Sequence, residues 1–267
     1  MAFHVVHGSP QDIWAPMTYA ATIYTGSIVE VDTTSASGNE GLVVKSVADG
    51  ENDGDDDSVI VGVCIGNNLR HPLYSATYFH EYITSADPTD STLEHVLTGG
   101  PFPTGSREDF VKISLVDPCT TINGPLFNGA WNTAPALLTA ASGLSHIGAT
   151  FNACQEYEQY HSTIYFRTGP NAGAYRILNN SDSTSVLAWD TPLYKDVVAG
   201  DTAVVVNTRN IGPGRIYTDA TATWIDCDHD NTEDFLGVFA VQLDLEIAGS
   251  ENLTFRFDGD HFTGKRT

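Results

Sequence analysis

Aspartates at alternate positions give this chain its best local candidate for metal chemistry. Asp226, Asp228 and Asp230 match the opening of a calcium loop, in which oxygen ligands converge on one hard cation. The remainder departs from the pattern, because Asn231 stands where glycine is expected and Gly237 where the bidentate glutamate is expected. We therefore expect a solvated acidic turn before a strand, with calcium binding as the alternative.

Residues that could catalyse a reaction are scattered along the chain. His4 and His7 lie three apart, but their segment offers no third metal ligand. The stretch 143–147, GLSHI, lacks the closing glycine of a nucleophile elbow, and the chain has no glycine-rich nucleotide-binding motif. We expect no enzyme and no cofactor. A hydrolase using two carboxylates stays open only because 34 acidic residues always allow some pair.

The four cysteines form no metal or redox motif. They are far apart and no C-x-x-C occurs: Cys64, Cys119, Cys154 and Cys227. We expect all four to be reduced and structural, with Cys64 buried inside the apolar run VIVGVCIG.

Charge and composition limit the class of partner. The 34 acidic residues exceed the 12 basic ones and give a formal net charge of −22, so phosphate repels the surface and direct nucleic-acid binding is not expected. No apolar run approaches the roughly 20 residues that span a bilayer. The amino end also lacks the pattern of a secretory signal. These features predict synthesis in the cytoplasm and no membrane partner.

The elements that would carry these residues read as short strands between turns. About a dozen β-favouring runs are separated by Gly, Pro, Asn, Asp or Ser, which is typical of antiparallel sandwiches or barrels. In the run 237–247 we expect Val241, Leu243, Leu245 and Ile247 to share the buried side. One segment, 134–141, has helix-favouring composition. The fold class predicted is all-β, with antiparallel sandwich or barrel modules and at most one short helix.

The pattern predicts four segments. Residues 1–18 form an extended arm, 19–116 a β domain, 117–150 an irregular segment that is either a linker or a single short helix, and 151–267 a second β domain. The arm holds large apolar side chains that favour contact with a neighbouring domain or subunit: Phe3, Val5, Val6, Ile13, Trp14 and Met17.

Residues 166–207 read as a β meander. The sequence is FRTGPNAGAYRILNNSDSTSVLAWDTPLYKDVVAGDTAVVVN. Strands are expected at 165–167, 175–178, 186–189 and 202–207, with the glycine- and proline-containing turn 169–173 between the first two. The phrase TG..AG.YR.I, followed by a strand, a Trp or Pro turn and AGDT, resembles one common in tailed-bacteriophage structural proteins.

The resemblance is to head decoration, or cement, proteins in particular. It implies a homo-oligomer, often a trimer, that sits on the outside of the capsid and bridges neighbouring copies of the major capsid protein. Similar phrases occur in tail and adaptor components, so a tail, collar or fibre-associated protein, with or without carbohydrate recognition, is the alternative.

Overall fold

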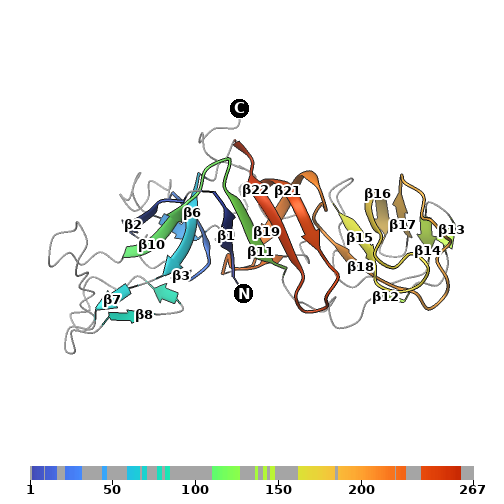
Figure 1. Cartoon of the computed structure of the whole chain (residues 1–267), viewed down its shortest axis with the longest axis horizontal. Helices are drawn as coiled ribbons and strands as arrows, with labels where there is room; N and C mark the ends of the chain where they lie inside the picture. Colours follow the sequence, from blue (N-terminus) through green and yellow to red (C-terminus); the bar gives the residue numbers. More distant parts are fainter. Residues whose placement is uncertain are drawn as a thin grey trace.

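The computed structural model of this chain is built from strands, turns and loops. It describes residues 2–8, 10–16, 22–31, 44–46, 59–66, 68–70, 77–79, 82–84, 110–126, 136–137, 141–142, 145–147, 162–183, 186–219, 221–226 and 236–259. Within these residues no α-helix occurs and strand pairing within the sheets is antiparallel (Figure 1). None of the sheets closes on itself. The all-β prediction is confirmed, in the form of open sheets rather than barrels.

A six-stranded sheet occupies the middle of the molecule and draws on both ends of the chain (Figure 1). We call it the central sheet. Its strand order is β1 (His4–His7), β11 (Thr121–Pro125), β22 (Asn252–Phe257), β21 (Leu236–Asp244), β19 (Gly212–Thr218) and β20 (Ile225–Asp226). Strands far apart in sequence are therefore neighbours in this sheet.

An amino-terminal sheet lies on one side of the central sheet (Figure 1). Its order is β2 (Asp12–Pro16), β10 (Phe110–Leu115), β6 (Ile60–Gly66), β4 (Ile28–Val31) and β5 (Val44–Ser46). Two small ribbons accompany it: β3 (Thr22–Tyr24) with β9 (Tyr82–Thr84), and β7 (Asn68–Arg70) with β8 (Thr77–Phe79). The Ile28 N–H donates to the Ala222 carbonyl at 3.0 Å, which joins this sheet to the β19–β20 connection.

A distal sheet lies on the other side (Figure 1). Its order is β12 (Ala136–Leu137), β18 (Thr202–Val206), β15 (Thr163–Phe166), β16 (Tyr175–Ser183), β17 (Val186–Trp189), β14 (Ser145–Ile147) and β13 (Ala141–Ser142). Strands β15 to β18 confirm the four predicted for the meander. The distal sheet is thus formed by the part of the chain between β11 and β19, two strands of the central sheet.

One apolar core runs through all three sheets. It includes Ile60 from the amino-terminal sheet, Phe255 from the central sheet, and Phe166 with Trp189 from the distal sheet. The last two rings meet edge to face with centroids 5.8 Å apart. Since burial of apolar area is the dominant stabilising contribution, this shared core couples the three sheets.

The first eighteen residues are largely structured within this chain, which corrects the expectation of an extended arm. Strand β1 pairs with β11 and strand β2 pairs with β10, each at the edge of its sheet. Strand β11, expected in the linker, is an interior strand of the central sheet. Main-chain groups that would be solvated in an arm are hydrogen-bonded in these ladders instead.

The alternative of a helix at 134–141 is not what the described residues of this segment form. Strand β12 pairs with β18 and β13 pairs with β14. An isolated helix of about eight residues is marginal because its nucleation is costly. Pairing with strands already present satisfies the same main-chain groups without that cost.

The alternation predicted for 237–247 holds over only part of the run. Leu243 and Leu245 are buried, but Val241 and Ile247 are exposed. The pairing of β21 with β22 shifts register between Ala240 and Gln242, and β21 ends at Asp244. A bulge of this kind turns the extra residue, Val241, away from the buried side.

The turn of the meander is pinned to a neighbouring loop by a buried amide. Asn171 donates from Nδ2 to the Lys195 carbonyl at 2.8 Å, and its Oδ1 accepts from the Lys195 N–H at 3.1 Å. Gly169 and Gly173 adopt φ angles of +84° and +88°, a region that favours glycine. A Cβ on Gly169 would overlap the Asp201 carboxylate, whereas one on Gly173 would meet open space. The TG..AG phrase is therefore explained by turn geometry.

These two glycines form a matched pair for mutation. Gly173→Ala is expected to lower the free energy of unfolding by about 1–2 kcal/mol, the cost of a left-handed non-glycine residue. Gly169→Ala should cost about 1–3 kcal/mol more, because Asp201 must move. Urea denaturation of both variants measures the difference. Equal midpoints would contradict the close approach of Gly169 to Asp201.

The central and distal sheets meet at a buried ion pair. Arg167 donates from Nη2 to Glu251 Oε1 at 2.6 Å, and the Gly249 N–H donates to the second oxygen of Glu251 at 2.7 Å. Nearby, the Leu245 N–H donates to the Tyr175 hydroxyl at 3.1 Å. Burial raises the pKa of Tyr175, so the hydroxyl stays protonated as this contact is made. These bonds fix the orientation of one sheet on the other.

Candidate functional site

The side of the central sheet that faces away from the core is built by strict alternation in β22. Leu253, Phe255 and Phe257 are buried, while Asn252, Thr254 and Arg256 are half-buried on the opposite side. Successive side chains of a strand point to opposite faces, so the second set defines an exposed surface. We call this surface the outer face.

Neighbouring strands extend the outer face in rows. Thr254 pairs with Asn123 of β11 and Gln242 of β21, and His4 of β1 pairs with Asn123. Nδ2 of Asn123 donates to Thr254 Oγ1 at 2.9 Å and to Asn252 Oδ1 at 2.7 Å. This row presents uncharged, hydrogen-bonded amide and hydroxyl groups whose positions are fixed by the sheet.

A second row adds an apolar centre. Phe239 of β21 pairs with Arg256 on one side and Pro213 on the other. The Phe239 side chain is 45% exposed, and Val241, at the bulge two residues later, is exposed as well. A large aromatic ring exposed on a rigid sheet is the kind of residue that anchors protein interfaces.

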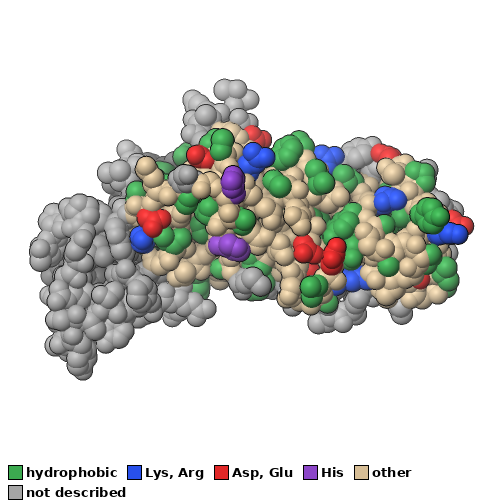
Figure 2. Space-filling view, in the orientation of Figure 1, with side chains coloured by type: hydrophobic (Ala, Val, Ile, Leu, Met, Phe, Trp, Pro, Cys, Tyr) green, Lys and Arg blue, Asp and Glu red, His purple; other side chains and the backbone are tan. Residues whose placement is uncertain are grey.

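The outer face carries charge of both signs. In its two rows Arg256 is the charged residue, His4 ends the first row and His7 follows it in β1. In the row beyond, Asp244 of β21 pairs with Asn252. Figure 2 shows histidine side chains over β1 on a face that is mostly apolar and uncharged polar. Depletion of charge at the centre of a surface is typical of a protein interface.

The arm residues predicted to make contacts are divided between core and surface. Phe3 is 3% exposed and packs edge to face on Phe255 with centroids 6.1 Å apart. Val5 packs on the same core, and Ile13 packs on a smaller cluster around Ile113.

Of the remaining three residues, one is exposed, one is described by its strand pairing, and one lies beyond the described ranges. Val6 is 56% exposed at the edge strand β1. Trp14 lies in β2 and pairs with Lys112, and Met17 is outside the described residues. The structure therefore does not gather the six residues on one surface.

The calcium candidate is only partly described. Asp226 is a half-buried residue at the end of β20, and Asp228 and Asp230 lie outside the described residues. Among the residues that are described, no group of three or more His, Cys, Asp or Glu side chains is placed to hold a metal ion.

Cys64 behaves as the buried thiol expected from its apolar run. Burial raises its pKa from 9.0 to about 11, so the thiol stays protonated at neutral pH and is a poor nucleophile. Cys119 is exposed, and neither Cys64 nor Cys119 forms a disulfide. Cys154 and Cys227 lie outside the described residues.

The outer face was not identified from the sequence as a site. Its signal is the alternation of NLTFRF, which separates two sides of β22 but does not show which strands lie beside it.

Within the described residues, no helix is long and apolar enough to cross a membrane. Comparison with protein-family models, with curated proteins and with solved structures finds no match.

Proposed function

We propose that this chain is a virion structural protein of a tailed bacteriophage that decorates the capsid. It is made in the host cytoplasm, binds the exterior of the assembled shell as a homo-oligomer, a trimer by resemblance, and bridges neighbouring major capsid subunits. It acts as a cement protein rather than an enzyme, and the outer face is the surface that contacts the shell.

The observation that carries this proposal is the character of the outer face. Phe239 and Val241 expose apolar surface beside a fixed row of amide and hydroxyl groups. The rows that hold Phe239 and Thr254 contain no acidic residue, and Asp244 lies in the next row, paired with Asn252. The resemblance of residues 166–207 to phage structural proteins supplies the kind of partner.

On this proposal the protein stabilises the assembled shell by adding interface area between neighbouring capsid subunits. A protein that binds the shell but not free capsid subunits stabilises the shell by mass action. A specific protein interface buries about 800 Å² on each partner. A rigid sheet can supply this area without the entropic cost of ordering a loop on binding. The central sheet is held between two others by one core, so its outer face is preorganised for docking.

A tail, collar or fibre-associated role is the second candidate. It fits the same all-β fold and the same resemblance. The number of copies in each particle separates the two roles.

Replacing Phe239 by aspartate is expected to weaken binding to the shell by about tenfold to a hundredfold, because a charge would be buried at the centre of the contact. The measurement is co-sedimentation with empty shells of the phage that encodes this chain, freed of bound copies. Ile247→Asp is the matched control, since Ile247 is also exposed but lies in the connection after β21. It should bind as the unmodified chain does.

Two results would count against this role for the outer face. One is unchanged occupancy of the shell by the Phe239→Asp protein. The other is an equal loss with Ile247→Asp, which would point to general charge repulsion rather than a defined contact.

A further inference from the structure

The loop between β17 and β18, residues 190–201, exposes two large apolar side chains. We call it the distal loop. Tyr194 is 86% exposed, the highest value among the large apolar side chains that the structure describes, and Val198 is 56% exposed. No strand is formed within the loop. Loops are also where binding residues are most often found, so we ask what holds this one in place.

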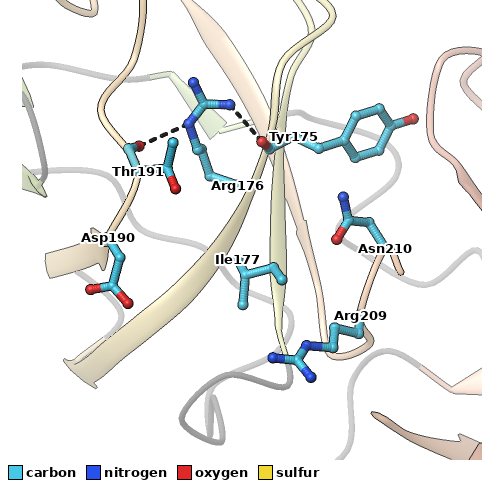
Figure 3. A pocket seen from close by; sticks show the side chains of 7 residues that line it. All are labelled: Tyr175, Arg176, Ile177, Asp190, Thr191, Arg209 and Asn210. Atoms are coloured by element: carbon cyan, nitrogen blue, oxygen red, sulfur yellow. Dashed lines mark hydrogen bonds between the residues drawn. The ribbon is translucent and has the colours of Figure 1, made fainter. Parts of the chain in front are cut away.

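The main chain of the distal loop is fixed by side chains of the distal sheet. Arg176 of β16 donates from Nε to the Thr191 carbonyl at 2.9 Å and from Nη2 to the Pro192 carbonyl at 2.7 Å. Figure 3 shows the first of these bonds. The buried Asn171 amide holds both main-chain groups of Lys195, as described above.

Two apolar side chains anchor the same loop in the core. Val197 is buried there, and Leu193 packs against it. The Val198 N–H donates to the Asp201 carboxylate at 2.9 Å. The loop is therefore preorganised, and binding through it does not carry the cost of ordering a flexible segment.

The exposed residues between these anchors form a small contact surface around one ring. Tyr194, Lys195 and Asp196 are consecutive and exposed. The Lys195 ammonium lies 5.7 Å from the centroid of the Tyr194 ring, so a face of the ring already attracts a cation. Tyrosine supplies a large contact area at a low cost in side-chain entropy, and it is enriched at the energetic centres of protein interfaces.

Charge selects the chemistry of the partner. The chain has a net charge of −22, so its field attracts basic surfaces and repels acidic ones. At the loop, a basic side chain of a partner can stack on the Tyr194 ring and approach the Asp196 carboxylate. The surface therefore fits a protein that presents an arginine or a lysine.

Bridging requires two contact surfaces on one molecule. The outer face belongs to the central sheet, and the distal loop belongs to the distal sheet, which lies at one end of the molecule (Figure 1). The buried pair of Arg167 and Glu251 fixes these two sheets to each other. Two sites held on one body strengthen each other, because the second contact forms at a high effective concentration.

We propose that the distal loop is the second contact with the shell, on a capsid subunit next to the one bound by the outer face. Tyr194 stacks on an arginine or lysine of that subunit, and Asp196 pairs with the same charge. This inference rests on the proposed capsid role and names the surface that completes the bridge.

The test is co-sedimentation of the full chain with empty shells of the phage that encodes it, freed of bound copies. Tyr194→Ala is expected to weaken binding by about tenfold to a hundredfold, whereas Tyr194→Phe keeps the ring and should bind nearly as the unmodified chain does. Ile247→Ala is the matched control, because Ile247 is an exposed apolar residue outside both surfaces. It should leave binding unchanged.

The neighbouring pair Lys195 and Asp196 tests the charge of the partner. Lys195→Ala removes the competing cation and should strengthen binding by about twofold to fivefold. Asp196→Ala should weaken it by about twofold to fivefold. Reversed signs would indicate an acidic partner, and no change in either variant would indicate an apolar contact. Both results contradict the proposal.

The remaining outcomes separate this inference from the capsid role. Unchanged binding by Tyr194→Ala, with the loss expected for Phe239→Asp, would overturn the loop contact and leave the outer face in place. Failure of the unmodified chain to bind shells would overturn the capsid role and the loop contact together. Normal shell binding by Tyr194→Ala with a smaller oligomer in sedimentation equilibrium would assign the loop to contacts between copies of this chain, against the proposal.

Discussion

Replacing Phe3 by alanine is expected to lower the free energy of unfolding by about 3–5 kcal/mol. The ring is 3% exposed, packs edge to face on Phe255 and lies over Gly124, where any side chain would overlap it. Its removal leaves a cavity beside the central sheet. Urea denaturation followed by tryptophan fluorescence measures the change in midpoint.

The matched control for Phe3 is Val6→Ala. Val6 lies three residues on and is 56% exposed, so its truncation should change the free energy of unfolding by less than about 0.5 kcal/mol. A small effect at Phe3, similar to that at Val6, would indicate that the amino-terminal segment does not belong to the core.

Removing Glu251 is expected to cost about 3–5 kcal/mol, because Arg167 is left buried without its partner. The side chains are 11% exposed for Arg167 and 1% for Glu251. The pair also fixes the junction between distal and central sheets, so the Glu251→Ala protein should unfold its distal sheet more readily. Hydrogen exchange of β15 and β18 measures this local effect.

The surface pair between Lys112 and Asp12 is the control for Glu251. Its atoms are 2.8 Å apart, but the side chains are 35% and 42% exposed. Asp12→Asn should therefore cost no more than about 1 kcal/mol. The double change Arg167→Met with Glu251→Leu should recover much of the lost stability. Equal costs for Glu251→Ala and Asp12→Asn would contradict a buried junction.

Local sequence was sufficient to predict the meander. Each strand from β15 to β18 is a β-favouring run ended by turn residues, and the turn itself requires glycine at positions 169 and 173. Signals of this kind lie within a few residues of each other, so they can be found without knowing the fold.

Pairing between distant strands could not be predicted in the same way. Strand β1 pairs with β11, and β11 pairs with β22, although each pair is far apart in the sequence. The contact that fixes β1 depends on the missing side chain of Gly124, which leaves room for Phe3. The short pattern HVVH does not alternate and gives no register. The expectation of an arm followed from this missing information.

The outer face depends on the same distant pairing. Alternation in β22 identifies an exposed side, but Phe239 joins it only through the pairing of β21 with β22.

The number of copies in each virion tests the decoration role most directly. Quantitative mass spectrometry of purified particles of the phage that encodes this chain gives its ratio to the major capsid protein. The proposal predicts on the order of hundreds of copies in a fixed ratio, as the symmetry of a shell requires. A count of about a dozen or fewer, as for a single ring or tail, would contradict it.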